Sequence, residues 1–511
     1  MRKSKYISII LATMLIFTSC GKSGEDKLQR KAESAVITLQ MRGTDSFNPL
    51  SVTHHSVRDA YSLCYDSLFV INNAIEPVGV LAQSIDISDD CMTAIVNLKD
   101  SVLWHDGIKL TANDVVYTIN LLKENPAWEY YECVKYIDEA TAIDALSLRL
   151  SLSRPYAQIA YSLTFPIVSA NNNSLDTLIV GTGAYKFSKY TPAVTLELEK
   201  NDLWHGGEAS SEKVNINIIK DNNAVTTAFN SGLLTAVTDE SFDTENSSPR
   251  ADAKTIAYQS GAFEYMVMNH KQGIFRSQSL RSAVSFAIDR FAIAENCYNN
   301  GALPVNAPIH PAAENIAESS ILSQYSLANA SEMLFLEGYT LDENTRLLVD
   351  SNNTPLSFGL LVNEENLSRI KTAELISKQL FAAGIDVRVE TLPFDSYTER
   401  IRKGNFDAYL GGTLLRNFYD FEGLFAKGGA LNNYGYESEN MQTALLALSQ
   451  ARGQDGLSDA LFNFEEIFLR EQPVCGLVFK SRVLIIAENA DGEITPHINS
   501  PYQNIANWII K

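Results

Sequence analysis

"LSFGLLV" (residues 356–362) opens the stretch that decides the fold class. It is a short apolar run, and "RIKTAELISKQLFAAG" (369–384) follows with apolar residues at helical spacing. "IDVRVETL" (385–392), "DSYTERIRKG" (395–404) and "FDAYLGG" (406–412) continue the alternation as strand, helix and strand. Strands that alternate with helices predict an α/β fold, in which helices cover a sheet that contains parallel pairs.

The same patterns extend outward from this stretch. Apolar residues at a period near 3.6 predict helices, and alternation at a period of two predicts strands. We expect helices at 58–71, 110–125, 224–234 and 279–301, and strands at 34–40, 146–153, 195–200, 213–220 and 263–269, with two strands around an Asp-Asp turn in 84–102. In the 110–125 helix, Thr111 and Asp114 have the spacing of a capping box.

Length and charge narrow the class further. The chain has 511 residues, 45% of them hydrophobic, and a formal net charge of −20. Because cores stop growing near ~250–300 residues, we expect more than one lobe. The acidity argues against a nucleic-acid partner, because phosphates would be repelled.

The N-terminus has the form of an export signal. Arg2, Lys3 and Lys5 precede an apolar run, 7–17, that is about half as long as a ~30 Å membrane core requires. Cys20 then follows small residues, as in a bacterial lipobox. We expect a signal peptide at 1–19 and a lipidated N-terminus with a polar tether at 20–35, which would anchor an exported protein to the cell membrane, facing the periplasm or the cell exterior. The alternative is a plain signal peptide with an incidental cysteine.

The remaining cysteines form no CxxC pair, which gives no support to a zinc knuckle or a thioredoxin motif. We expect Cys64, Cys91, Cys133, Cys297 and Cys475 to be mostly buried.

"GTGAY" (181–185) could be a phosphate loop or a backbone turn. A phosphate loop requires GxxxxGK[ST], and a dinucleotide loop requires GxGxxG at the start of a helix. Here Tyr185, Lys186 and Phe187 lead into a strand instead. We therefore expect a turn.

Other candidates for chemistry are weak. His105 and Asp106 could act as an acid/base or metal pair, but Asp106-Gly107 is typical of a turn above Trp104. His54 and His55 are adjacent, yet seven histidines over the chain form no ligand cluster. No GxSxG elbow is present. We expect no enzyme activity, no catalytic residue, no metal site and no cofactor.

Six motifs in order resemble a known family. They are "DSFNPL" (45–50), "VLWHDGIKLTANDVVYTINLL" (102–122), "GTGAYKF" (181–187), "LEKNDLWHGG" (198–207), "LRSAVSFAIDR" (280–290) and "FDAYLGG" (406–412). Together they resemble the extracellular solute-binding proteins of peptide and nickel ABC transporters, family 5.

The resemblance implies a two-lobe periplasmic-binding-protein type II (cluster C) fold. Lobe I would be discontinuous, with a subdomain inserted in it, and two chain crossings would form a hinge. The expected divisions are lobe I at 36–60, 180–262 and 478–511, the inserted subdomain at 61–179, and lobe II at 263–477. Trp104, Asp106, Gly107, Gly181 and Gly183 would be structural residues of the shared motifs.

The resemblance also implies a ligand cleft, and here the sequence departs from the family. Peptide binders carry Gly-Trp-x-x-Asp after the 406–412 strand, where this chain has Thr413 and Arg416; Asp420 lies four residues further on. An arginine suits a carboxylate or phosphate better than an ammonium group. A rim salt bridge is the alternative for Arg416. The full set of expected ligand contacts is Phe47, Asn48, Asn363, Arg369, Thr413, Arg416, Asp420, Asn432 and Tyr436.

The expected function is capture of a small solute, a peptide first of all, for delivery to the permease of an ABC importer. Two alternatives stay open: a binding protein for a nickel chelate, sugar or anionic metabolite, and a lipoprotein sensor without transport. An exported hydrolase is disfavoured because no triad or metal cluster is present. We expect a monomer whose partners are the ligand, the permease and, through the N-terminal lipid, the membrane.

Overall fold

The structure is a computed structural model of the chain. It describes residues 36–44, 46–172, 175–176, 179–242, 247–299, 301–313, 325–498 and 500–511. The predicted signal peptide, Cys20 and the tether lie outside these residues. Within them, no helix combines the length and the apolar character needed to cross a membrane.

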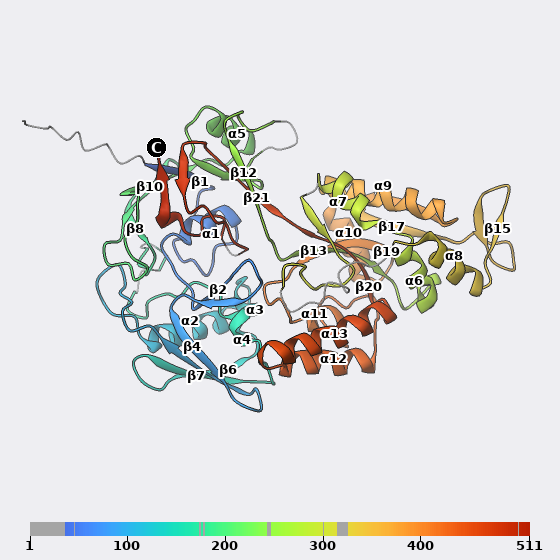
Figure 1. Cartoon of the computed structure of the whole chain (residues 1–511), viewed down its shortest axis with the longest axis horizontal. Helices are drawn as coiled ribbons and strands as arrows, with labels where there is room; N and C mark the ends of the chain where they lie inside the picture. Colours follow the sequence, from blue (N-terminus) through green and yellow to red (C-terminus); the bar gives the residue numbers. More distant parts are fainter. Residues whose placement is uncertain are drawn as a thin grey trace, which may run out of the picture.

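A six-stranded sheet organises one half of the molecule, on the right of Figure 1. Its order is β14-β20-β13-β19-β17-β18. β17 pairs in parallel with both β18 and β19, as the alternation in 356–412 predicts, and the other pairs are antiparallel. The strands are β13 (Ala262–Met268), β14 (Ala302–Pro304), β17 (Ser357–Asn363), β18 (Asp386–Leu392), β19 (Ala408–Leu414) and β20 (Val474–Lys480).

Helices cover both faces of this sheet. Along β13, Phe263, Tyr265 and Val267 enter one core, and Met266 and Met268 enter the other, as the two-residue period of a strand requires. The first core contains side chains of α10 (Phe394–Arg402), α11 (Glu422–Phe425), α12 (Glu439–Gln450) and α13 (Gly453–Glu471). The second contains side chains of α6 (Gln278–Phe286), α7 (Arg290–Tyr298), α8 (Leu327–Leu336) and α9 (Leu367–Ala382).

The single helix predicted over 279–301 is wrong, because the structure has two helices there. α6 ends at Phe286, and Asp289 begins α7 by accepting a hydrogen bond from the Ala292 N–H at 3.1 Å. Buried Arg290 donates to the Gly476 carbonyl at 2.8 Å and to the Ser285 carbonyl at 3.0 Å. These bonds hold the corner between α6 and α7 against β20. The periodicity of the apolar residues alone could not reveal this corner.

The other half of the molecule contains three smaller sheets. Their orders are β1-β10-β9-β8, β11-β21-β12 and β4-β5-β7-β6. The strands are β1 (Ile37–Met41), β4 (Ala82–Ile87), β5 (Thr93–Leu98), β6 (Ile137–Ala142), β7 (Ser147–Leu152), β8 (Tyr185–Thr191), β9 (Thr195–Lys200), β10 (Lys213–Ile218), β11 (Ala236–Thr238), β12 (Lys254–Tyr258) and β21 (Arg482–Ile486). The helices are α1 (His55–Tyr61), α2 (Ala112–Glu124), α3 (Tyr131–Val134), α4 (Ile159–Ser162) and α5 (Asn222–Asn230).

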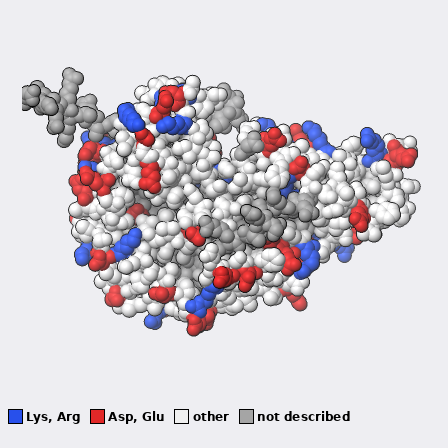
Figure 2. Space-filling model, in the orientation of Figure 1, with Lys and Arg blue, Asp and Glu red and all other residues white. Residues whose placement is uncertain are grey.

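Short elements complete the chain. They are the strand pairs β2 (Phe69–Ile71) with β3 (Pro77–Gly79), β15 (Thr340–Asp342) with β16 (Leu347–Val349) and β22 (Ala490–Gly492) with β23 (Trp508–Ile510), and the 3₁₀ turns Ile274–Arg276 and Ile505–Asn507. The chain passes between the two halves twice, from β12 to β13 and from β20 to β21. On the face shown in Figure 2, acidic and basic side chains lie in small, separated groups.

The helix predicted over 58–71 is only partly correct. α1 ends at Tyr61, and the chain then runs alongside the Gly-Thr-Gly segment. The carbonyls of Leu63 and Cys64 accept hydrogen bonds from the N–H groups of Tyr185 and Gly183 at 3.1 and 2.9 Å. This non-local pairing replaces the helical bonds that the apolar spacing favours.

The GTG segment is a turn and not an anion loop. A side chain at Gly181 would place its Cβ 1.8 Å from the Cys64 carbonyl oxygen, so only glycine permits the close approach. His105, next to buried Trp104, accepts a hydrogen bond from the Gly181 N–H at 3.1 Å and lies 3.2 Å from the Gly183 carbonyl. Two of the quoted motifs therefore meet in space, and the ring of His105 joins them.

The five described cysteines are buried, as expected, and all five are free thiols. The predicted capping box also forms, since Asp114 accepts hydrogen bonds from the backbone N–H and the hydroxyl of Thr111 at 2.8 and 3.0 Å.

Candidate functional site

A cavity of about 280 Å³ lies where the two halves of the molecule meet. One wall comes from α1 and the loop that follows it, and another from residues near the C-terminus, including His497 and Tyr502. The crossing segments contribute Tyr258 and Arg482, and the segment after β19 contributes Arg416. The cavity is thus bounded by both halves and by both of their connections.

Charged groups of both signs line this cavity. The cations are Arg58, Arg416 and Arg482, and the anions are Asp59 and Asp66. A cavity with both signs can contact a ligand that carries both an anionic and a cationic group.

A carboxylate bridges two of these arginines. Glu129, in the loop between α2 and α3, forms ion pairs with Arg58 through one oxygen and with Arg416 through the other. The Arg416 guanidinium also lies over the ring of Tyr130, 5.5 Å from its centre. The three charged residues come from three places in the chain: α1, the α2–α3 loop and the segment after β19.

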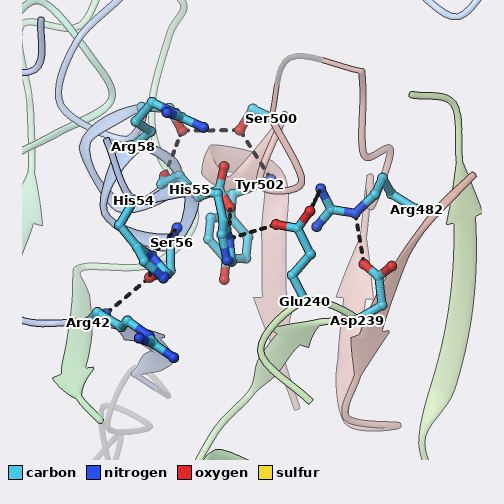
Figure 3. A network of polar contacts seen from close by, with 12 residues as sticks. Arg42, His54, His55, Ser56, Arg58, Asp239, Glu240, Arg482, Ser500 and Tyr502 are labelled. Carbon is cyan, nitrogen blue, oxygen red and sulfur yellow. Dashed lines mark hydrogen bonds and ion pairs between the residues drawn. The ribbon is translucent and has the colours of Figure 1, made fainter. Parts of the chain in front are cut away.

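A second network lies against the crossing strand β21 (Figure 3). Glu240 lies between His55 and Arg482. One of its carboxylate oxygens lies 2.9 Å from Nδ1 of His55, and the other lies 2.9 Å from Nη1 of Arg482. Arg482 also pairs with Asp239 at 3.0 Å. Burial alone would raise the pKa of Glu240, but His55 and Arg482 outweigh it and lower that pKa to about 2.

Asp59 has the opposite electrostatic environment. Burial raises its pKa to about 6, and the nearby charges of Arg482 and His55 only partly counter this effect. Its side chain is 16% exposed and lies one turn after His55 on α1. Asp59 is therefore more easily protonated than an exposed aspartate and remains mostly ionised at pH 7.

His54 caps the N-terminus of α1, the helix that carries His55 and Asp59. Nδ1 of His54 accepts a hydrogen bond from the Ser56 N–H at 3.2 Å and so caps α1. Burial and the neighbouring His55 lower the pKa of His54 to about 4, which keeps the ring neutral and able to accept. His54 is thus a capping residue, while its neighbour His55 faces Glu240.

Asp66 connects the cavity to the GTG turn. It accepts a hydrogen bond from the Thr182 hydroxyl at 3.0 Å and lies 3.0 Å from His205 Nε2. Within the described residues, no group of three His, Cys, Asp or Glu side chains is placed to hold a metal ion.

Among the expected ligand contacts that the structure describes, Arg416 alone lines the cavity. Asp420 lies outside it, paired with Lys135 at 2.9 Å where α3 meets the six-stranded half. Tyr136 donates to Asp420 and to Glu422 at 3.4 and 3.3 Å, and Arg154 pairs with Glu422. Asp420 therefore belongs to a polar contact between the halves.

Arg369 is held inside the six-stranded half. Its guanidinium makes two bonds to the buried carboxylate of Glu264, at 2.7 and 3.2 Å, and lies 3.4 Å from the Asn363 side-chain oxygen. The guanidinium of Arg369, one of the expected ligand contacts, is thus already paired with Glu264.

The other expected contacts lie elsewhere. Phe47 packs against the ring of Tyr190, with centres 5.0 Å apart, and Asn48 accepts from the Leu50 N–H at 3.0 Å. Thr413 faces Phe263 across β13 and β19. Asn432 donates to the carbonyls of Ala426 and Tyr436, and the Tyr436 hydroxyl donates to Glu471 at 2.7 Å.

Most of the charged groups around the cavity were not predicted from the sequence. These are Arg58, Asp59, Asp66, Glu129, Glu240 and Arg482. One available signal was the Arg58-Asp59 pair inside an otherwise apolar helical pattern. The partners Glu129, Glu240 and Arg482 are too distant in sequence to be found without the fold.

Comparison with known proteins agrees with this architecture. A family model described as bacterial extracellular solute-binding proteins, family 5 Middle, matches residues 76–433. The oligopeptide-binding protein AppA of Bacillus subtilis (strain 168) is 23% identical over 529 residues, which cover 98% of this chain and 97% of that protein. The nickel-binding protein NikA of Staphylococcus aureus (strain NCTC 8325 / PS 47) is 22% identical, with 88% and 87% covered.

A solved structure confirms the fold class. The nickel ABC transporter structure from Bacillus halodurans superposes with a TM-score of 0.79 at 20% identity, covering 94% of this chain and 100% of that one. The predicted α/β fold of solute-binding type is therefore correct.

Proposed function

The chain belongs to the bacterial extracellular solute-binding proteins of family 5, and from this premise we propose that it captures a peptide between its two lobes for ABC import. The family is one of non-enzymatic proteins that bind a solute and deliver it to an ABC transporter. What we propose beyond the family is that the solute is a peptide.

The observation that carries the proposal is the cavity between the halves, with charges of both signs on its walls. A peptide presents an ammonium and a carboxylate group, and Asp59, Asp66, Arg58 and Arg416 offer a partner for each. The relative named for oligopeptide binding, which covers nearly the whole chain, supports the same choice.

The proposed mechanism is closure of two lobes about the crossings. We assign residues 263–477 to lobe II, and 36–60, 180–262 and 478–511 to lobe I with 61–179 inserted. Closure around the solute would exclude water and strengthen each polar contact to it. Bridging waters would allow side chains of different sizes in the same cavity.

A non-peptide solute is the second candidate. Three arginines face the cavity, and an arginine fork suits a carboxylate or phosphate. A nickel chelate is also open, because one relative is named for nickel binding. A lipoprotein sensor that feeds no transporter would use the same cavity.

Calorimetry separates a peptide from a nickel chelate or a sugar as the solute. The protein is titrated with a peptide pool, with a nickel–histidine mixture and with sugars. Heat from the peptide pool alone supports the proposal. Heat only from one of the other two, with none from peptides, would replace peptide by that class of solute.

We further propose that the protein is a monomer and that Cys20 carries the lipid that holds it at the cell membrane. Cys20 follows the apolar run and is flanked by small and polar residues, which supports the lipid anchor. The family is extracellular or periplasmic, in agreement with export.

A further inference from the structure

We propose that Glu129 occupies the binding position for an anionic ligand group, and that the ligand's carboxylate displaces it from Arg58 and Arg416. This inference rests on the proposed function, since it identifies one subsite of the same cavity.

The first support is geometric. Arg58 and Arg416 line the cavity from opposite halves of the molecule, and Glu129 joins both with its two oxygens. A carboxylate is thus held between two cavity-facing guanidinium groups, and a ligand carboxylate has the same shape and charge. The position is already built for such a group.

The second support is that Glu129 can leave. It belongs to the loop between α2 and α3, and its side chain is 33% exposed, so it can withdraw into water without unpacking a core. Its two partners are also partly exposed, at 19% and 24%. A partly exposed ion pair contributes little net free energy, so a ligand can compete with it.

The contrast with Arg369 supports the same assignment. Glu264, the partner of Arg369, has a side chain only 7% exposed, and Lys480 also lies 3.7 Å from it. That pair is fixed within one half and does not line the cavity. Arg482 also lines the cavity and pairs with the partly exposed Asp239 and Glu240. Among the described arginines that line the cavity, Arg58 and Arg416 are the two that share one carboxylate.

An ion pair that serves only to hold the halves together is the competing interpretation. The chain contains a matched control for it, because Arg154 and Glu422 also join the α3–α4 region to the six-stranded half. The side chain of Glu422 is 28% exposed, close to the 33% of Glu129. Neither carboxylate lines the cavity itself, but both arginines that Glu129 pairs with do, whereas Arg154 does not.

The test compares Glu129→Gln with Glu422→Gln by calorimetry. Glutamine keeps the size of the side chain and removes its charge, so the internal competitor is weakened. The probes are tri-alanine, tri-alanine with a C-terminal amide, and succinate. We expect E129Q to bind a carboxylate probe about three- to tenfold more tightly than the natural protein does. E422Q should bind like the natural protein, and the amide should show no gain.

Each result has a defined meaning. A gain for tri-alanine identifies a peptide carboxylate, and a gain for succinate alone identifies a non-peptide acid; both support the subsite. The double variant E129Q/R416A should lose the gain. Equal affinities in E129Q and the natural protein, an equal gain in E422Q, or no binding of any carboxylate probe at millimolar concentration would overturn it.

Failure of the subsite is distinguishable from failure of the proposed function. Retention of an uncharged or cationic solute by the purified protein, detected by mass spectrometry, would leave solute capture intact while Glu129 is merely structural.

Discussion

Arg482 Nη1 lies 2.9 Å from Oε1 of Glu240, and this pair fastens the crossing strand β21 to the turn after β11. The second bond of Arg482, to Asp239, strengthens the attachment. The chain between β20 and β21 is therefore fixed on one side of the crossing. If the lobes close as proposed, we expect the bending between Lys480 and Arg482 and at the other crossing, after Tyr258.

The raised pKa of Asp59 predicts that its protonated form stabilises the fold. Its folded pKa is raised from 3.8 to about 6, so the folded protein holds the proton more tightly than the unfolded chain does. This contribution is favourable at low pH and is lost as the pH rises through this window. Asp59→Asn should raise the free energy of unfolding at pH 7 by up to ~3 kcal/mol and change it little below the unfolded pKa. Urea denaturation at both pH values measures it.

Glu240 supplies the internal control with the opposite sign. Its pKa falls from 4.5 to about 2, so its charge stabilises the fold at neutral pH, and this stabilisation is lost as the pH falls toward 2. Glu240→Gln should destabilise the protein at pH 7.

A D59N variant that is less stable than the natural protein at pH 7 would show that Asp59 is needed as an anion.

Arg416 should affect binding more than folding. Its ion pair is partly exposed, so Arg416→Ala should lower the free energy of unfolding by no more than about 1 kcal/mol. Loss of a charge-assisted contact in a closed cavity should weaken solute binding by ~10-fold or more. Calorimetry and thermal unfolding on the same samples separate the two effects. Unchanged affinity would make Arg416 a rim residue.

Arg369 should show the reverse pattern. Arg369→Met leaves the carboxylate of Glu264 buried without its bidentate partner, which costs about 3–5 kcal/mol of stability. The double variant R369M/E264Q should recover part of this loss. Affinity measured well below the melting temperature should stay near that of the natural protein. A large loss of affinity in a variant of normal stability would return Arg369 to the list of ligand contacts.

Cys20 decides how the protein is retained in the cell. If it carries the lipid, Cys20→Ser should move the mature protein from the membrane fraction to the soluble fraction. Immunoblotting of both fractions measures this. Unchanged fractionation would contradict the anchor and leave a plain signal peptide as the explanation.

The fold was largely readable from the sequence because local patterns and tertiary contacts agree there. The strands and helices between 356 and 412 show this, since each apolar face meets a core that its period predicts. Expectations failed where a distant segment overrode the local pattern. The chain after Tyr61 pairs with the GTG turn, and the corner before Arg290 is held by β20.

The site was far less readable, because its charges come together only in the folded chain. Arg416 could be found at a motif position where the family carries an acid. Its partner Glu129 lies 287 residues away, and Glu240 lies 242 residues before Arg482. Arg369 shows the converse, since it was expected to contact the ligand while the fold supplies Glu264 as its partner.

Native mass spectrometry tests the central claim, capture of a solute without chemical change, most directly. The natural protein, as purified and after incubation with a peptide pool, should retain one solute molecule per chain, released with unchanged mass on denaturation. Arg58→Ala/Arg416→Ala should lose it. A protein that retains nothing from any pool, or one that releases cleaved products, would contradict the account.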